Sequence, residues 1–522
     1  MIKKLSAFPC TSWIIYVLLT LLLLAGFGLR MIDLTDQPLD FHPARQLHAA
    51  IIARGMYAQM LATWPNAPHW LQDSEWAGLT PANYELTKAQ AAIQMWHSMS
   101  IYEPQILERL VALTYWLIGA EVLWIARVYS AMFWVLGGLG LFLLSRRAAS
   151  VQGGFLALTF YLFLPFGVTA SRSFQPDPLM VSLVIWSAYA AYRWGEEKTW
   201  FWAILTGILS GLSVLIKAPA ACQVGMLLIL TVLVAWGFKQ AIRQPQVWVV
   251  AAISVLIPAS FYIIQRGTKS AGYMEFWSAS FASMLEPAFF IRWLNFLDNY
   301  IVQISFFFIG LASIFLLSAR GKATALGLWI GYGITGLLLP ALIVSHNYYS
   351  LPLIPAIAFS LAPLASPIWQ VLSKQHKLWQ AALFGVVILA LAYSGWNSRV
   401  SLVAEDYRQE PPGWQAIARE LPTDGRIIAI AHDYGHRLRY YGWVSISRWP
   451  TSAELNLNVR RGSDPEVFAS MFTQMTEGYD YFLITLHHEL DTQPQLSQML
   501  FDNYPLLVDK DEYLLFDLRP SP

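Results

Sequence analysis

The sequence has little charge and almost no cysteine. Only 13% of its 522 residues are charged, about half the share of an ordinary soluble domain, and 34 lysines and arginines against 33 aspartates and glutamates leave a net charge of +1. This composition excludes a disordered chain and a nucleic-acid binder that relies on bulk positive charge, and it does not fit an ordinary soluble enzyme. The two cysteines, Cys10 and Cys222, support neither a disulfide framework nor a zinc cluster.

The sequence is instead rich in long apolar runs. Hydrophobic residues make up 56% of the chain, and about eleven runs before residue 400 are long enough to span a bilayer. The predicted spans are 13–29, 122–144, 154–170, 178–194, 200–216, 218–236, 247–264, 296–317, 324–344, 348–364 and 378–393. No small-residue cleavage site follows the first run, so we interpret it as a retained anchor. Gly207 and Gly211 lie four residues apart in one run, which favours close helix packing.

Basic residues mark every second connection between these runs. They are Lys3 and Lys4, Arg146 and Arg147, Arg193 and Lys198, Lys239 and Arg243, Arg320 and Lys322, and Lys374 and Lys377. Because short cytoplasmic loops carry an excess of lysine and arginine, these connections are predicted to be cytoplasmic. The long first loop, 30–105, and the C-terminal tail are then expected to be extracytoplasmic. Within that loop, residues 33–60 form an amphipathic pattern that predicts a helix on the outer leaflet.

The tail beyond residue 396 has a different pattern. Short β-like runs at 426–430, 481–485 and 513–516 alternate with helical patterns at 414–420 and 465–475. We therefore expect a multi-span α-helical membrane domain over residues 1–396 and a soluble α/β domain over 397–522. The tail's aromatics Tyr440, Tyr441 and Trp443 either pack its core or stack on an acceptor.

Several polar residues cluster on the predicted outer side of the membrane, where unpaired charge is costly. They are Asp33, Asp36, Asp40, His42 and Arg45 after the first run, Glu103 before a helix-like stretch, Arg172 and Asp177 in one turn, Lys217 in another, and His346, Tyr348 and Tyr349 in a third. Carboxylates, cations and a histidine at one depth suit a site for a phosphate. The cations would hold the phosphate, and a carboxylate would deprotonate an incoming nucleophile.

Each of these residues also has a structural interpretation. The aspartates after the first run are typical of a solvated loop, and Asp177 fits the N-cap of a helix that begins near Pro178. Arg172 and Lys217 could extend to the membrane surface, and His346 alone would be an interfacial histidine. The functional hypothesis depends on all the groups sharing one side of the membrane.

Five short motifs resemble those of the polytopic GT-C glycosyltransferases. Arg127 with Ser130 and Ala131, the turn 171–177, the stretch 211–219 ending in Lys-Ala-Pro, the stretch 346–352 ending in Leu-Pro, and Glu103 with Pro104 occur in the order seen in that group. The likeness is to glycosyltransferase family 39, which includes protein O-mannosyltransferases and lipid A aminoarabinose transferases. The resemblance in the arrangement of spans and loops covers roughly residues 13–360.

The resemblance implies a role for each residue. Asp40 matches the catalytic carboxylate of the first loop, although the glutamate usually beside it is missing, and Asp36 and Asp33 remain alternatives. Arg172 and Lys217 would bind the donor phosphate. The remaining residues would line the pocket, orient the sugar or hold a divalent metal. They are Asp36, His42, Arg45, Glu103, Asp177, His346, Tyr348 and Tyr349. The sequence shows no well-spaced set of metal ligands.

The function that the resemblance implies is sugar transfer in a bacterial-type inner membrane. A polyprenyl-phosphate hexose or pentose would be the donor, an acceptor hydroxyl on a glycan, lipid or protein would receive the sugar, and membrane lipids would surround the chain. No nucleic-acid partner is expected. A secondary transporter is the main alternative, although transporters place ionisable groups near the midplane and often repeat their halves. A non-catalytic envelope scaffold is the other alternative.

Overall fold

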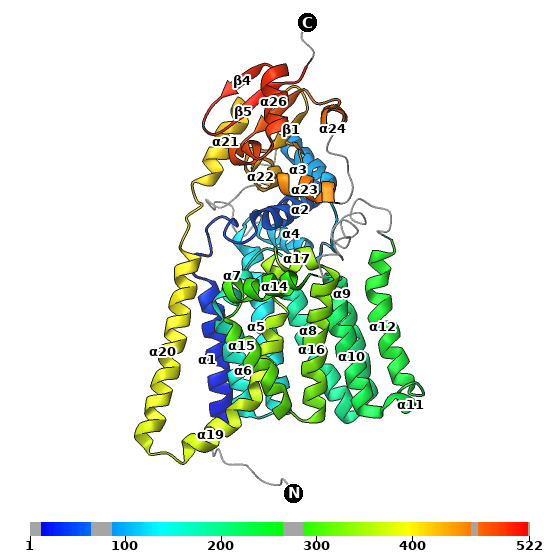
Figure 1. Ribbon diagram of the computed structural model, residues 1–522, viewed down its shortest axis with the longest axis vertical. Helices are drawn as coiled ribbons and strands as arrows, with labels where there is room; N and C mark the ends of the chain where they lie inside the picture. Colours follow the sequence, from blue (N-terminus) through cyan, green and yellow to red (C-terminus); the bar gives the residue numbers. More distant parts are fainter. Residues whose placement is uncertain (1–11, 64–85, 265–285, 461–467, 520–522) are drawn as a thin grey trace. The chain divides into compact units, whose positions relative to one another are not determined.

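The computed structural model describes residues 12–63, 86–264, 286–460 and 468–519 (Figure 1). Its chain divides into two compact units. The first, which we call the helical unit, comprises residues 1–34, 100–107 and 126–404. The second, the α/β unit, comprises 35–99, 108–125 and 405–522. Lys3, Lys4 and Cys10 lie outside the described residues.

The helical unit places every predicted apolar run on helical segments. Its helices are α1 (Ser12–Arg30), α5 (Trp124–Ala148), α6 (Val151–Phe163), α7 (Pro165–Ala170), α8 (Asp177–Glu197), α9 (Trp200–Ile216), α10 (Ala220–Trp236), α11 (Phe238–Ala241), α12 (Pro245–Tyr262), α14 (Pro287–Tyr300), α15 (Ile304–Ser313), α16 (Ala319–Leu338), α17 (Pro340–Ile343), α18 (Leu353–Leu361), α19 (Ala365–Ser373) and α20 (Lys377–Leu402). Five helical segments of the described residues are long and apolar enough to cross a membrane, or six if one bent pair is counted. The chain is therefore an integral membrane protein.

Several predicted spans are broken rather than straight. The run 154–170 divides into α6 and α7 at Leu164, whose extended backbone precedes Pro165. A residue before proline disfavours the helical conformation, which explains the break. The run 296–317 also divides, because α14 and the segment that begins with α15 are bent by 106°. An uninterrupted apolar run in the sequence therefore does not show where a helix ends.

Glycines allow the helices of this unit to approach closely. A Cβ atom added at Gly331 of α16 would lie 2.2 Å from the Cα atom of Gln223 on α10. On α9, a Cβ atom at Gly207 would lie 3.0 Å from Ile253 of α12, and one at Gly211 would lie 3.0 Å from the carbonyl oxygen of the same residue. The predicted packing role of Gly207 and Gly211 is confirmed.

A five-stranded sheet forms the centre of the α/β unit. Its strands are β1 (Ile427–Ile430), β2 (Ser447–Arg448), β3 (Tyr481–Ile484), β4 (Leu506–Asp509) and β5 (Leu514–Asp517), in the order β2-β1-β3-β5-β4. The first three strands are mutually parallel and the last two are antiparallel to their neighbours. All three predicted strands are confirmed, and so is a C-terminal α/β fold.

Helices from the tail and from the first loop complete this unit. They are α2 (Pro43–Thr63), α3 (Leu86–Ser98), α4 (Ile106–Ile118), α21 (Glu410–Glu420), α22 (His436–Gly442), α23 (Ser452–Arg460), α24 (Phe468–Thr476), α25 (His487–Asp491) and α26 (Pro494–Asn503). The predicted helical patterns correspond to α21 and α24, although 465–467 lie outside the described residues. We expected a soluble α/β domain over residues 397–522; the compact unit that contains most of this segment also includes 35–99 and 108–125.

Helix α2 differs from the helix predicted for residues 33–60. It begins only at Pro43, and almost every residue from Gln46 to Ala58 is buried, including Arg54. It packs against α3, the next described helix, and against α22, which is distant in sequence (Figure 1). A helix buried on all sides cannot rest one face on a membrane, so the prediction of a surface helix is wrong here.

Candidate functional site

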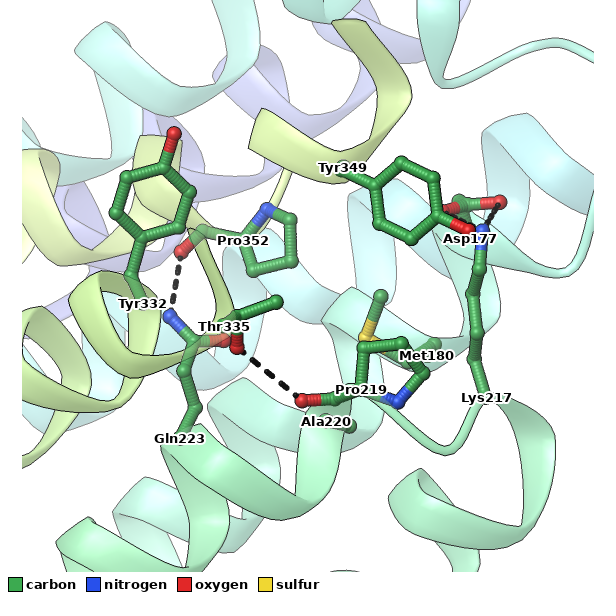
Figure 2. A pocket seen from close by; sticks show the side chains of 10 residues that line it. All are labelled: Asp177, Met180, Lys217, Pro219, Ala220, Gln223, Tyr332, Thr335, Tyr349 and Pro352. Carbon is green, nitrogen blue, oxygen red and sulfur yellow. Dashed lines mark hydrogen bonds and ion pairs between the residues drawn. The ribbon is translucent and has the colours of Figure 1, made fainter. Parts of the chain in front are cut away.

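A buried ion pair is the centre of the first group of predicted residues (Figure 2). Lys217 ends α9, and its ammonium donates to both carboxylate oxygens of Asp177 at 2.8 and 2.9 Å. Lys217 is 3% exposed and Asp177 1%. Lys217 therefore does not extend to the membrane surface. Asp177 is not the N-cap of α8 either, because Pro176 occupies that position.

Aromatic rings cover the same ammonium group. The Lys217 nitrogen lies 4.4 Å from the ring centroid of Tyr348 and 4.7 Å from that of Tyr349, within cation–π range. The two tyrosines share the short helical turn Asn347–Ser350. The ring of His346 meets Tyr348 edge-on at 5.5 Å, and its Nδ1 atom is 2.7 Å from the hydroxyl of Ser345. The structure thus brings together five of the predicted residues: Asp177, Lys217, His346, Tyr348 and Tyr349.

A small pocket opens beside this ion pair. Besides Asp177, Lys217 and Tyr349, its lining includes Gln223 and Tyr332, which the sequence did not indicate (Figure 2). The Gln223 amide donates to the carbonyl oxygens of Leu328 and Pro352 at 3.1 and 3.2 Å. A glutamine within the apolar run 218–236 was the available signal for this residue.

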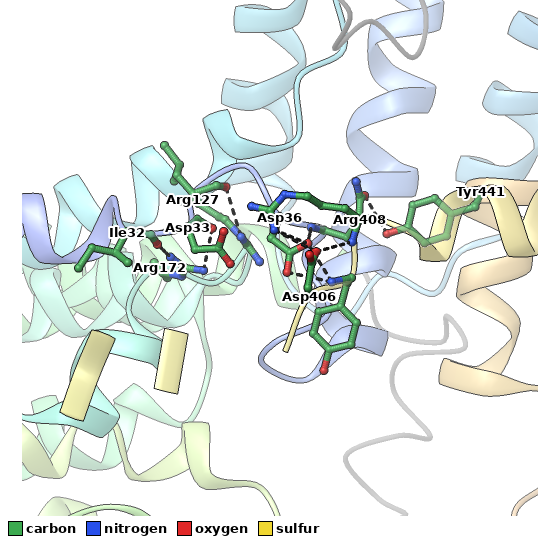
Figure 3. Close-up of polar contacts among 11 residues, drawn as sticks. Ile32, Asp33, Asp36, Arg127, Arg172, Asp406, Arg408 and Tyr441 are labelled. Carbon is green, nitrogen blue, oxygen red and sulfur yellow. Dashed lines mark hydrogen bonds and ion pairs between the residues drawn. The ribbon is translucent and has the colours of Figure 1, made fainter. Parts of the chain in front are cut away.

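Two arginines hold the backbone that follows α1. Arg172, 1% exposed, donates to the carbonyl oxygens of Ile32 and Asp33 (Figure 3), and Arg127 donates to that of Leu34 at 3.3 Å. These carbonyls lie in the turn after α1, outside any helical hydrogen-bond ladder, and guanidinium groups satisfy such acceptors well. Because Arg172 is buried, the idea that it extends to lipid headgroups is wrong. Its role at a donor phosphate stays a prediction.

Arg30 is a buried charge that sequence reasoning missed. It is fully buried and donates to the hydroxyl of Ser171 at 2.6 Å and to the carbonyl oxygens of Leu162 and Gly167 at 3.1 and 3.4 Å. Leu162 and Gly167 flank the break between α6 and α7, and Ser171 caps the end of α7, so Arg30 holds both helices at the break. Its position at the end of an apolar run made it look like a loop residue.

The loop before α2 places the candidate carboxylates of the α/β unit in different surroundings. Asp36 is 6% exposed, and its carboxylate accepts the backbone N–H of Tyr407 at 3.0 and 3.1 Å and lies 3.9 Å from Arg408 (Figure 3). Asp40 is only partly buried and accepts a hydrogen bond from the Gln46 amide at 3.2 Å. A catalytic base must reach its substrate, so Asp40 fits that role better than Asp36 does.

The neighbouring residues His42 and Arg45 organise the start of α2. His42 has a left-handed backbone, with a φ of 48°, and its carbonyl oxygen accepts the N–H of Arg45 at 2.9 Å. The His42 ring meets Phe41 edge-on at 4.8 Å, and both His42 and Arg45 are partly exposed. Asp36, Asp40, His42 and Arg45 thus share one short segment of the α/β unit. Glu103 is partly exposed on a bend before α4 and belongs to the helical unit.

The residues of the described ranges do not fit a divalent metal site. Within 12–63, 86–264, 286–460 and 468–519, no three histidine, cysteine, aspartate or glutamate side chains converge as a metal site would require. Carboxylates such as Asp36 and Asp177 instead accept hydrogen bonds from a backbone amide and a lysine. No catalytic step is therefore derived through a metal.

Comparison with known families agrees with the resemblance in the sequence. Residues 103–264 match the model of a family described as dolichyl-phosphate-mannose-protein mannosyltransferase. This stretch includes Glu103, Arg172, Asp177 and Lys217. No curated protein sequence matches the chain.

Several solved structures have the same fold and align with nearly the whole of this chain. ArnT from Cupriavidus metallidurans in the apo state is 15% identical, with 98% of each chain covered and a TM-score of 0.55. The same protein bound to undecaprenyl phosphate is 15% identical, with 97% of this chain and 98% of that chain covered and a TM-score of 0.53. The apo oligosaccharyltransferase of Archaeoglobus fulgidus is 14% identical, with 91% of this chain and 70% of that chain covered and a TM-score of 0.53. The predicted fold, a multi-span helical membrane domain with a C-terminal α/β domain, is confirmed and is shared with these structures.

Proposed function

Because the chain has the fold of the GT-C glycosyltransferases, we propose that it transfers a sugar from a polyprenyl-phosphate donor to an acceptor hydroxyl. The observation that carries the proposal is the family match over residues 103–264, which holds the buried Lys217–Asp177 pair and Arg172. Structures with this fold contain isoprenoid phosphates: undecaprenyl phosphate in ArnT, and dolichol-phosphate in the archaeal oligosaccharyltransferase AglB. These ligands support the proposed donor class.

The proposed reaction is a displacement at the anomeric carbon of the sugar. The acceptor oxygen forms a bond to that carbon, the bond from the carbon to the phosphate oxygen breaks, and the acceptor proton passes to Asp40. Negative charge grows on the departing polyprenyl phosphate. Lys217 and Arg172 would stabilise this charge, because fixed cations in a water-poor site favour a transition state that develops negative charge.

Asp177, Tyr348 and Tyr349 support Lys217 in this role. The carboxylate fixes the ammonium, and the two rings cover it on other sides. A lysine held in this way needs little reorganisation when the phosphate gains charge. His346 and Glu103 would contribute to the pocket wall, and His42 and Arg45 would border Asp40.

The proposal includes a location and a range of substrates. The alternating basic connections favour a site on the extracytoplasmic face. The family resemblance implies a bacterial-type inner membrane. The sugar would be a hexose or pentose, and the acceptor a glycan, a lipid or a protein. Tyr440 and Tyr441 do not serve as exposed stacking platforms for the acceptor, because they are 3% and 6% exposed.

Sugar transfer by the purified full-length chain tests the proposal. The chain would be placed in nanodiscs with radiolabelled polyprenyl-phosphate sugar and envelope extract as acceptor. We expect transfer by the natural sequence and a loss of about 100-fold or more in Asp40→Asn, the scale of general-base catalysis. Full activity of Asp40→Asn would refute the assignment of the base.

Three further measurements separate the alternatives. Mass spectrometry of envelope glycans from a deletion strain should show a glycan that lacks one sugar. Uptake of labelled solute into proteoliposomes without sugar transfer would favour a transporter. Unchanged donor binding in Arg172→Ala and Lys217→Ala would contradict the phosphate site and favour a scaffold.

A further inference from the structure

The loop that carries Asp40 has little regular structure of its own. Residues 35–42 form turns and bends, with a backbone hydrogen bond from Leu39 to the carbonyl oxygen of Gln37 at 2.8 Å. The position of such a segment depends on the groups that hold it from outside. The α/β unit supplies these groups on both sides of Asp40.

On the N-terminal side, the tail holds two consecutive loop residues. The carboxylate of Asp36 accepts the backbone N–H of Tyr407, and the Gln37 side-chain oxygen accepts the hydroxyl of Tyr441 at 3.1 Å. Figure 3 shows Tyr441 on α22 pointing at this segment. Asp36 and Tyr441 are both buried, so these bonds are protected from competition with water.

On the C-terminal side, the tail holds the helix that continues the loop. Arg54 of α2 donates to both carboxylate oxygens of Glu121 at 3.0 Å and to the carbonyl oxygen of Tyr440 at 2.5 Å. Its guanidinium lies 3.7 Å from the ring centroid of Tyr440 and 4.4 Å from that of Trp443. Burial disfavours the charged form, but Glu121 and Tyr440 outweigh burial and raise the pKa of Arg54. The arginine therefore stays charged and paired.

Tyr440 and Tyr441 are neighbours on α22, so one short helix contacts both flanks of the loop. We infer that the tail positions the Asp40 loop: Tyr407 holds Asp36, and α22 holds Gln37 through Tyr441 and Arg54 through Tyr440. The C-terminal segment thus has a role in the orientation of the proposed base. This inference rests on the proposed function for the catalytic meaning of Asp40, whereas the contacts themselves do not.

Two variants of the full-length chain in nanodiscs test the inference. Tyr441→Phe removes only the hydroxyl that reaches Gln37, and Asp36→Leu removes the acceptor for Tyr407. We expect hydrogen exchange of the amides in 35–42 to rise about fivefold, the consequence of one lost hydrogen bond. We also expect kcat to fall about tenfold while the KM for the donor stays within about twofold, because a displaced base affects the chemical step.

Matched variants separate positioning from general damage. Asp36→Asn keeps an oxygen acceptor and should restore most of the lost activity. Tyr479→Phe removes a comparable hydroxyl, bonded to Ser447 at 2.7 Å elsewhere in the α/β unit, and should leave exchange in 35–42 unchanged.

The outcomes distinguish this inference from the proposed function. Unchanged exchange in 35–42 in both Tyr441→Phe and Asp36→Leu would overturn the inference, even if kcat fell. Increased exchange together with unchanged kcat would also overturn it, since the held loop would not matter for the reaction. If the natural sequence transfers no sugar but the exchange rises as expected, the proposed function fails and the holding role of α22 stands.

Discussion

At the residue scale, the stability of the helical unit depends on the single pair of Lys217 and Asp177. Both are almost fully buried in a chain with few charges, so each requires the other. Removing one partner of a buried pair leaves an uncompensated charge, whereas replacing both by apolar residues often costs little. The stability of the helical unit should therefore depend on the pair as a unit rather than on either residue.

We predict that Lys217→Met and Asp177→Leu each lower the free energy of unfolding by about 3–5 kcal/mol, the usual scale for one lost partner of a buried pair. The double variant should be closer to the natural sequence than either single variant. Thermal unfolding in detergent checks this. Glu197→Gln is the control, because its pair with Arg193 is partly exposed and its loss should change the stability little. Losses that simply add in the double variant would contradict the prediction.

The same residues show what a sequence can reveal about a site. Lys217, Tyr348 and Tyr349 could be grouped in advance because their motifs stand beside apolar runs on one predicted side of the membrane. Arg30 and Gln223 could not, because their partners are backbone carbonyl groups of distant helices. Any residue type supplies such a carbonyl, so no sequence pattern records the contact.

The residue pattern of the sequence predicted some helices and strands correctly and one helix wrongly. Each outcome has a physical reason. The strands β1, β3 and β5 were predictable, since short β-branched and aromatic runs between turn signals have few other conformations. Helix α2 was misjudged, because the amphipathic pattern predicted one apolar face on a membrane, whereas the structure buries the helix and pairs Arg54 with Glu121. A charged residue therefore indicates exposure only when no buried partner is available.

At the scale of elements, the packing of α22 against α2 should respond to pH. His436 of α22 meets His48 of α2 with ring centroids 5.7 Å apart. Burial, together with the nearby His48, Arg439 and Arg448, holds the pKa of His436 well below its usual value of 6.5. Burial and Arg437 also lower the pKa of His432, whereas Asp433 and Glu410 partly oppose this shift. The folded chain therefore keeps these histidines neutral at a pH where the unfolded chain binds protons.

We predict that stability falls as the pH drops below about 6.5, by at most about 1.4 kcal/mol per pH unit for each such histidine. His436→Phe removes one of these groups and should lose less stability than the natural sequence between pH 7.5 and 5.5. Thermal midpoints of the α/β unit across this range provide the measurement. His488→Gln, at an exposed side chain, should follow the natural sequence. Identical pH profiles for His436→Phe and the natural sequence would refute the role of His436.

At the scale of the whole molecule, the division into units does not follow the order of the chain. The α/β unit combines the tail 405–522 with 35–99 and 108–125. The buried cluster of Arg54, Glu121 and Tyr440 takes one residue from each segment. Composition marks where the tail begins but cannot show that the tail shares its core with a loop that precedes it by some 300 residues. The unit should therefore be held together by packing rather than by the single covalent connection after α20.

Cutting that connection tests this view. A protease recognition sequence inserted after Ala404, within the exposed residues 403–406, would allow the tail to be severed in the otherwise intact chain. We predict that the severed fragment 405–522 stays with the membrane fragment in size-exclusion chromatography at high salt, because buried ion pairs and apolar contacts are little screened.

Glu121→Ala should release the severed fragment, since Arg54 would then be buried without its carboxylate partner. Glu420→Ala, which removes a carboxylate bonded to Lys510 and Tyr513 within the tail itself, should not. Free elution of the severed tail from the natural sequence would mean that residues 405–522 fold as an independent domain.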